Sequence, residues 1–125
     1  MNRQEQPEDL MSSGMKMVMA AGDARELAKR AIDQIVRADF DAARGLLAEA
    51  ERALVSGHAV QTAVIQQECD GQTQGYNVLF AHGMDSLMTV KSEVAQAVSL
   101  LAIVEALSTR LSGLERLHSG ATEGA

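Results

Sequence analysis

Apolar side chains return every three or four residues through most of this chain, a spacing typical of helices with one buried face. The pattern predicts a first helix from about residue 8 to 38 and a second from Phe40 to near Cys69, with Asp39 as its N-cap. A loop-like composition follows at 70–75, and a third helix is predicted from near Asn77 to about Leu117. Three long helices with short connections predict an all-α fold, an antiparallel up-down-up three-helix bundle.

One domain is expected between residues 10 and 117, preceded by a flexible N-terminus at 1–9 and followed by a disordered tail at 118–125. A chain of 125 residues is long enough for one modest core. Aromatic residues make up only 2% of the chain, so this core must be built from Ala, Leu, Val, Ile and Met. That set of side chains favours packed helices over sheets.

The third helix carries two apolar lanes with a polar lane between them. The lane expected to face the core consists of Leu87, Val90, Val94, Ala97, Leu101, Val104 and Leu111. The second apolar lane consists of Met84, Met88, Ala95, Ala102 and Ala106. The lane between them consists of His82, Asp85, Thr89, Ser92, Gln96, Ser99 and Ile103. A solvated face normally carries Lys and Glu, so we expect this helix to be buried on more than one side, through self-association of the chain.

His82 and Asp85 are the candidate chemical groups of the polar lane. Three residues turn a helix by about 300°, so the two side chains share a face. The surrounding residues are apolar or weakly polar, which predicts a partly shielded site. A titratable histidine in such a place can carry a phosphoryl group, a proton or a metal ion.

Charge and cysteine content narrow the classes of function. A formal net charge of −6 argues against nucleic-acid binding, which needs a basic surface. The single cysteine, Cys69, allows no disulfide within the chain and fits a reducing cytosol. No apolar run approaches the roughly 20 residues that span a bilayer, and the acidic N-terminus is unlike a signal peptide. We therefore expect a cytoplasmic protein without direct membrane insertion.

Four segments of the chain match, in order, the motifs of one known family. Residues 82–88 read His-Gly-Met-Asp-Ser-Leu-Met, where the family has His-Ala-Gln-Asp-His-Leu-Met. Gly-Asp-Ala-Arg at 22–25 and Ala-Asp-Phe at 38–40 are similar to motifs of the family's first and second helices, and 57–68 follows its second helix closely. The chain thus resembles the lactose/cellobiose-type enzyme IIA components of the bacterial phosphoenolpyruvate-dependent sugar phosphotransferase system, over roughly residues 10 to 112.

The resemblance implies a homotrimer of enzyme IIA-like three-helix domains that carries phosphate during uptake of a β-linked disaccharide, of the lactose, cellobiose or chitobiose class. It implies that His82 accepts a phosphoryl group on its Nε2 (tele) nitrogen from the phosphohistidine of the carrier HPr. His82 would then pass the group to a cysteine of a sugar-specific enzyme IIB. The resemblance also implies that Asp85 faces the trimer axis, where three copies surround a divalent cation, with Mg²⁺ as the expected ion.

Two residues beside His82 depart from the family pattern. Met84 stands where the family has Gln, and Ser86 stands where it has a second His. A methionine cannot donate a hydrogen bond to a phosphoryl oxygen, whereas a serine hydroxyl can. Met84, Ser86, Met88 and His58 are candidates to line the site, although helix packing explains His58 equally well.

These departures leave two other functions open. One is a non-catalytic regulatory or interaction protein on the same trimeric bundle, with an altered active site. The other is a helical oligomerisation module in which the histidine has no chemical role.

Arg25 stands two residues from Asp23 and so points to a different face, from which it could reach across a subunit interface. The methionines near the start of the chain are expected to pack in the core or an interface rather than to bind a soft metal.

Overall fold

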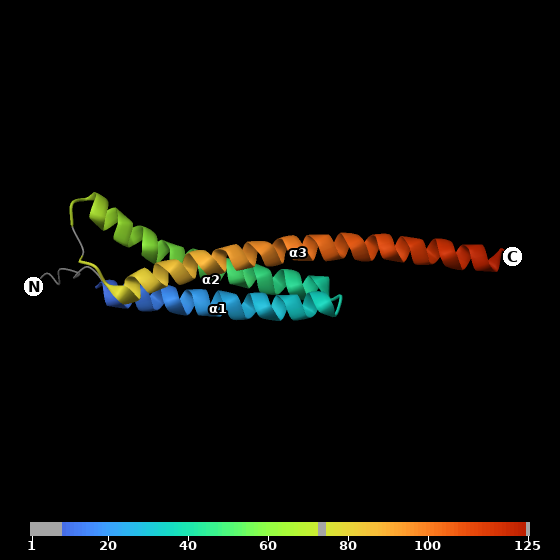
Figure 1. Cartoon of the computed structure of the whole chain (residues 1–125), viewed down its shortest axis with the longest axis horizontal. Coiled ribbons are helices and arrows are strands. Elements are labelled where there is room, and N and C mark those ends of the chain that lie inside the picture. The colour runs from blue at the N-terminus through green and yellow to red at the C-terminus, as the bar shows by residue number, and fades with distance from the viewer. Residues whose placement is uncertain (1–8, 73–74, 125) are drawn as a thin grey trace, which may run out of the picture.

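The computed structural model describes residues 9–72 and 75–124, which form three helices and no strand. Helix α1 spans Leu10–Val36, α2 spans Phe40–Cys69 and α3 spans Val78–Glu123. They run up, down and up, as Figure 1 shows. The expectation of an all-α three-helix bundle is confirmed. Residues 1–8 of the predicted flexible N-terminus and 73–74 of the predicted loop lie outside the described residues.

Each helix begins at a polar residue whose side chain accepts a hydrogen bond from the first turn. Asp9 Oδ1 accepts from the Ser12 amide at 2.7 Å, and Asp39 Oδ1 accepts from the Ala42 amide at 3.1 Å. Asn77 caps α3 in the same way. Such bonds satisfy amide groups that lack a partner within the helix. The predicted N-cap at Asp39 and the predicted bounds of α2 are confirmed.

α1 ends in a tight turn that reverses the chain toward α2. The amide of Ala38 donates to the carbonyl oxygen of Ile35, and the amide of Asp39 donates to that of Gln34. This pair of bonds is the Schellman arrangement, which requires a left-handed residue after the helix. Ala38 takes that conformation at a φ of 60°, so the turn carries backbone strain that a glycine would avoid.

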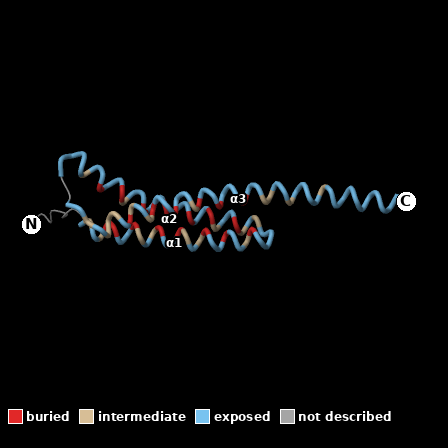
Figure 2. Tube along the Cα trace, in the orientation of Figure 1, coloured by how far each residue is buried: buried red, intermediate tan, exposed pale blue. Residues whose placement is uncertain are grey.

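The core lies along α1, which packs against both other helices (Figure 2). Its two clusters are dominated by Ala, Leu and Val. The first consists of Met17, Ala21, Ala24, Ala28, Ala50, Leu54, Leu87, Val90 and Val94. The second consists of Ala31, Ile35, Ala43, Leu47, Ala97 and Leu101. α2 and α3 contact each other less, and they diverge toward their connection (Figure 1).

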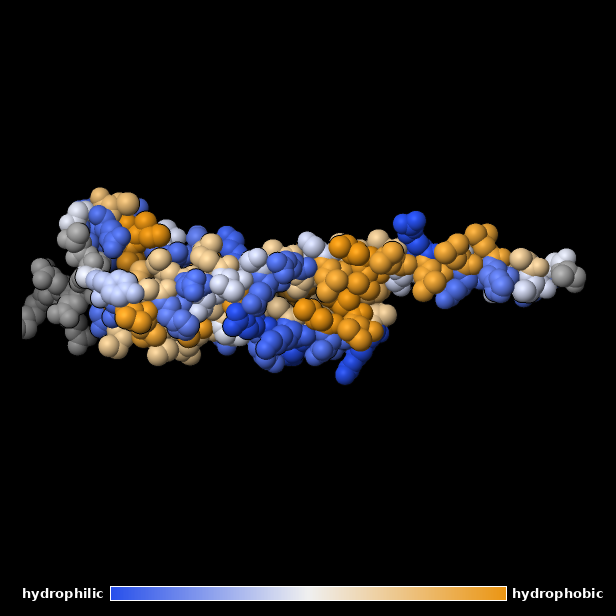
Figure 3. Space-filling model, in the orientation of Figure 1, coloured by the Kyte–Doolittle hydropathy of each residue, from blue (hydrophilic) through white to orange (hydrophobic). Residues whose placement is uncertain are grey.

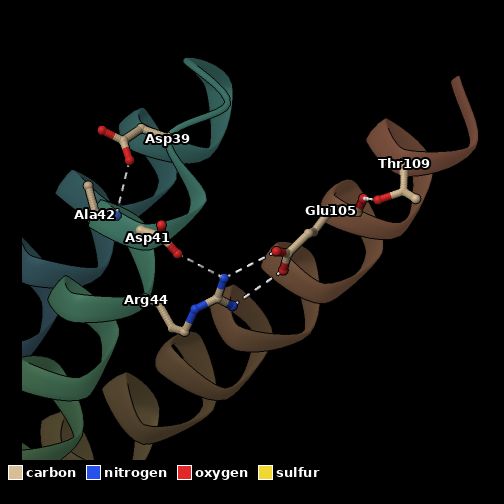
Figure 4. A network of polar contacts seen from close by, with 6 residues as sticks. All are labelled: Asp39, Asp41, Ala42, Arg44, Glu105 and Thr109. Atoms are coloured by element: carbon tan, nitrogen blue, oxygen red, sulfur yellow. Dashed lines mark hydrogen bonds and ion pairs between the residues drawn. The ribbon is translucent and has the colours of Figure 1, made fainter. Parts of the chain in front are cut away.

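An ion-pair network joins α2 to α3 near the α1–α2 turn. The Arg44 guanidinium donates to both carboxylate oxygens of Glu105, at 3.3 and 3.1 Å, and also reaches Asp41 (Figure 4). A bidentate pair of this kind fixes both distance and orientation. It holds α3 against the end of the hairpin formed by α1 and α2.

α3 is longer than the sequence predicted. It runs to Glu123 rather than to about Leu117, so residues 118–123 are helical and the prediction of a disordered tail there was wrong. No proline interrupts this stretch, and the helix continues until Gly124. Leu111 was assigned to the core lane but is 58% exposed, because α1 and α2 end before they reach it. Val104 is partly buried, and the preceding members of that lane are buried as predicted.

By length and composition alone, α3 could cross a membrane. An 18-residue window within it reaches a mean hydropathy of 1.5. The sequence analysis had identified no segment long and apolar enough to span a bilayer. The core helix of a soluble bundle passes the same test, so one such helix is weak evidence for insertion.

Candidate functional site

Two glycines hold the start of α3 against α1. A Cβ atom added at Gly83 would lie 2.7 Å from the carbonyl oxygen of Gly14 and 3.1 Å from the Cβ of Met17. A Cβ added at Gly14 would lie 2.7 Å from the backbone nitrogen of Phe80. Backbones approach this closely only where a side chain is missing. The crossing therefore fixes the backbone of α3 directly beside His82.

His82 and Asp85 lie on the exposed side of α3, near its N-terminus. The intervening Gly83 and the following Leu87 are buried, so the helix turns its other side to the core. The two exposed residues thus share a side, as their spacing predicted. Thr89 Oγ1 donates to the backbone carbonyl of Asp85 at 2.8 Å, a bond that does not involve the Asp85 carboxylate.

Ser86 and Met84 differ in how they relate to His82. Ser86 follows His82 by four residues, so the two are neighbours on adjacent turns of one side of the helix. Met84 follows by two residues, about 200° around the helix, and packs against the first core cluster. Within one chain, therefore, the partly buried Met84 packs against the core cluster, and Ser86, which is also partly buried, lies on the side of α3 that carries His82.

Met88 and His58 come together in a groove between α2 and α3. The groove encloses about 410 Å³, and its other walls include Leu54, Val94 and Lys91. Met88 is 47% exposed there. His82 does not line this groove, so the structure separates Met88 and His58 from His82 within a chain.

A bidentate ion pair joins α1 to α3 on the side of His82. Arg25 Nε and one terminal nitrogen donate to the two carboxylate oxygens of Glu93, both at 2.9 Å. The Arg25 guanidinium holds the pKa of Glu93 below its ordinary value of 4.5, against the opposing effect of partial burial. Arg25 was expected to be able to reach another subunit, and it finds a partner within its own chain instead.

Sequence reasoning missed both the glycine crossing and this ion pair. The glycines gave a usable signal, because Gly14 and Gly83 stand inside helices, where glycine usually marks close packing. The ion pair gave no signal in the sequence. Arg25 and Glu93 are 68 residues apart, and spacing rules within a helix relate only residues three or four apart.

The described residues of a single chain hold no group of three or more His, Cys, Asp and Glu side chains that could bind a metal ion. Asp85 contributes one exposed carboxylate. A metal site at Asp85 would therefore need carboxylates from further copies of the chain.

Comparison with known proteins places this geometry in a family. A family model for the lactose/cellobiose specific IIA subunit of the PTS system matches residues 12–105. The lactose-specific EIIA component of Staphylococcus epidermidis is 35% identical over 89 residues, covering 71% of this chain and 82% of that protein. The corresponding protein of Lacticaseibacillus casei is 35% identical over 82 residues, covering 66% and 73%.

Two solved structures resemble the fold. PtcA from S. mutans has a TM-score of 0.75 and 25% identity, and the match covers 84% of this chain and 99% of PtcA. The cellobiose specific enzyme IIA from Bacillus anthracis has a TM-score of 0.77, with 83% and 95% covered, and at 22% identity it supports the fold alone. The family match includes residues from all three helices, reaches residue 105 of α3 and contains His82 and Asp85. The chain therefore belongs to the lactose/cellobiose-specific IIA family of the sugar phosphotransferase system.

Proposed function

We propose that this protein is a phosphocarrier in which His82 accepts a phosphoryl group from phospho-HPr and passes it to a sugar-specific enzyme IIB. The observation that carries the proposal is an exposed histidine on the α3 surface within the family-matched region, beside a backbone fixed by the glycine crossing. In the first step, the N–P bond on HPr breaks as a bond forms between phosphorus and His82 Nε2. In the second, that bond breaks as an S–P bond forms on a cysteine of enzyme IIB.

The residues around His82 suit this transfer. A neutral imidazole is a competent nucleophile near neutral pH, so the reaction requires positioning more than activation. The exposure of His82 lets two different partners reach it in turn. The Ser86 hydroxyl, one turn away, is placed to donate a hydrogen bond to a phosphoryl oxygen. His82 is the fifth residue of α3, where the positive end of the helix dipole still gives partial help.

The assembly that we propose is a homotrimer with Asp85 at its axis. Three converging carboxylates repel one another, and a divalent cation such as Mg²⁺, which prefers oxygen ligands, would neutralise them. The exposure of Asp85 in the single chain is compatible with this role. Consistent with the family, we propose a cytoplasmic protein that serves uptake of a β-linked disaccharide, with the membrane-spanning steps left to other components.

The test is phosphoryl transfer from radiolabelled phosphoenolpyruvate through purified enzyme I and HPr. His82→Ala should remove the label, whereas His58→Ala, the matched control on α2, should retain it. Labelled wild-type protein should then lose its label to a cognate enzyme IIB. Wild-type labelling of His82→Ala would refute the site.

One alternative function is a non-catalytic regulator on the same fold. It is suggested by Met84 and Ser86, which differ from the residues of the family motif. A wild-type protein that binds HPr with no label in the same assay would support the regulator instead. The phosphocarrier is favoured by the Ser86 hydroxyl, which keeps a hydrogen-bond donor one turn from His82 even though Met84 supplies none.

A further inference from the structure

The first turns of α1 leave methionines exposed on the outside of the bundle. Met11 and Met15 are 60% and 47% exposed, whereas Met17 of the same helix is completely buried. Val18 follows Met15 by one turn and is partly buried, so Met11, Met15 and Val18 form one apolar strip, which we call the α1 strip. In Figure 3, apolar surface appears at the end of the molecule where α1 and α3 begin.

The register between α1 and α3 sets the level of the α1 strip. The two helices run parallel, with Gly83 opposite Gly14 and Glu93 paired with Arg25. Each residue of α3 therefore stands beside the α1 residue about 68 positions earlier. By this offset, His82 stands beside Gly14. The two methionines of the α1 strip lie on either side of Gly14 in α1, so they are within one helical turn of the level of His82.

The same ion pair shows which sides of α1 and α3 border each other. Eleven residues, about three full turns, separate His82 from Glu93, so both side chains point to one side of α3. Seven residues, about two full turns, separate Val18 from Arg25, so these point to one side of α1. Because Arg25 and Glu93 meet, the side of α1 that carries the strip borders the side of α3 that carries His82.

A protein that exchanges a phosphoryl group with His82 covers the surface around that residue. The phosphorus atom must lie in line with the His82 nitrogen at near-bonding distance, so the two proteins are in contact on every side of the imidazole. The α1 strip then contributes apolar contact area beside His82. Methionine suits a surface that serves two partners in turn, because its unbranched side chain adapts its shape to each of them.

We propose that Met11 and Met15 are sites of reversible oxidation, at which hydrogen peroxide weakens the docking of phospho-HPr beside His82. This inference rests on the phosphocarrier function proposed above. The thioether sulfur attacks one oxygen of the peroxide as the O–O bond breaks. The proton on the transferred oxygen moves to the departing oxygen, which leaves as water. Sulfur is thereby oxidised to a sulfoxide by two electrons, and the peroxide is reduced.

The sulfoxide changes the chemistry of the α1 strip without changing its position. It is polar and accepts hydrogen bonds, so its burial against an apolar partner surface costs free energy that burial of the thioether does not. Methionine sulfoxide reductases return the sulfoxide to the thioether, with a thiol as the electron donor. The modification is therefore reversible. It acts on docking and leaves the His82 imidazole itself unchanged.

The first test is the order in which the methionines react. It uses the full chain with Cys69→Ser, because the exposed thiol of Cys69 would also be oxidised. After mild treatment with hydrogen peroxide, peptide mass analysis should find one added oxygen on Met11 and on Met15 before any on Met17. Another copy of this chain is the competing occupant of the α1 strip. Resistance of Met11 and Met15 equal to that of Met17 would indicate such cover and would overturn the proposal.

The second test measures transfer from phospho-HPr before and after peroxide treatment. Oxidation of the Cys69→Ser protein should raise the KM for phospho-HPr by at least about fivefold and leave kcat within about twofold, because docking is weakened and chemistry is not. A methionine sulfoxide reductase with dithiothreitol should reverse the change. A fall in kcat with an unchanged KM would overturn the proposal.

Matched pairs of substitutions assign the effect to the α1 strip, each variant being compared with its own unoxidised form. Met11→Leu with Met15→Leu should abolish the response of KM to peroxide. Met19→Leu with Met88→Leu removes two exposed methionines that line grooves beside α2, and this variant should respond as fully as its parent. Equal responses of the two variants would overturn the proposal.

Binding of HPr to the His82→Ala form separates this inference from the proposed function. Oxidation should weaken that binding, measured by calorimetry, by the same factor as it raises KM. Labelling of His82 with a KM that ignores oxidation would refute the oxidation sites and leave the phosphocarrier intact. HPr binding that weakens on oxidation in a protein that takes no label would refute the phosphocarrier and keep the oxidation sites. A chain that does not bind HPr at all would refute both.

Discussion

Ser86 follows His82 on the next turn of the same side of α3, so we propose its hydroxyl as a donor to the phosphoryl group. We expect Ser86→Ala to slow phosphoryl transfer by about tenfold, the effect of losing one hydrogen bond to a charged group. Met84→Leu should leave the rate unchanged, because it replaces one apolar side chain packed against the core cluster by another of similar size and removes no hydrogen-bond donor. Rates of label transfer from HPr measure both. Equal slowing by the two variants would contradict the assignment of Ser86.

The glycine crossing makes a second prediction at the residue scale. Gly83→Ala should destabilise the protein by about 1–3 kcal/mol, because its Cβ would meet the Gly14 carbonyl oxygen at 2.7 Å and the backbones would have to separate. Gly45→Ala on α2 meets nothing within 4 Å and should be neutral or stabilising by up to about 1 kcal/mol. Urea unfolding distinguishes the two, and equal stability of both variants would show that the crossing is not tightly packed.

At the scale of the helices, capping residues and the spacing of apolar residues predicted the helix bounds that depend only on neighbouring residues. Asp39 was identified as an N-cap, and the apolar period placed α2 correctly, because caps and periods act over one or two turns. The end of α3 was misplaced, since small polar residues after Leu117 resembled a tail and yet continue the helix. Arg25 and Glu93 could be paired only once α1 and α3 were seen to pack side by side. The candidate site was predicted from a motif and stays a prediction, whereas the packing of Met84 against the core cluster could be seen only in the structure.

The ion pair between α1 and α3 predicts a pH dependence. Arg25 lowers the pKa of Glu93, so the pair contributes stability that is fully present above about pH 4.5. That contribution is lost as the pH falls through the pKa of Glu93 in the folded state. Its size is small, because the two side chains remain 43% and 42% exposed and solvent screens them.

Urea unfolding of Glu93→Gln over a series of pH values tests this linkage. The variant should be less stable than wild type at neutral pH and should lose this difference in acid. Glu26→Gln, which removes an exposed carboxylate of α1, serves as the control for charge alone. If the difference in unfolding free energy between wild type and Glu93→Gln grows as the pH falls, the predicted contribution of the ion pair is contradicted.

At the scale of the whole molecule, the proposed trimer makes Asp85 a source of repulsion when no cation is bound. Asp85→Leu should then stabilise the assembly in chelator by about 1–4 kcal/mol, since apolar side chains replace three buried charges. Calorimetry with and without Mg²⁺ measures the effect, and the wild type alone should respond to the ion. Equal or lower stability of Asp85→Leu in chelator would count against an axial position.

The central claim is that His82 carries the phosphoryl group, and intact-mass analysis with phosphorus NMR tests it most directly. After incubation with phosphoenolpyruvate, enzyme I and HPr, each wild-type chain should gain the mass of one phosphoryl group. That group should be acid-labile, should resonate as an Nε2-phosphohistidine and should be missing from His82→Ala. A folded wild-type protein that gains no mass, or a group that persists in His82→Ala, would contradict the claim.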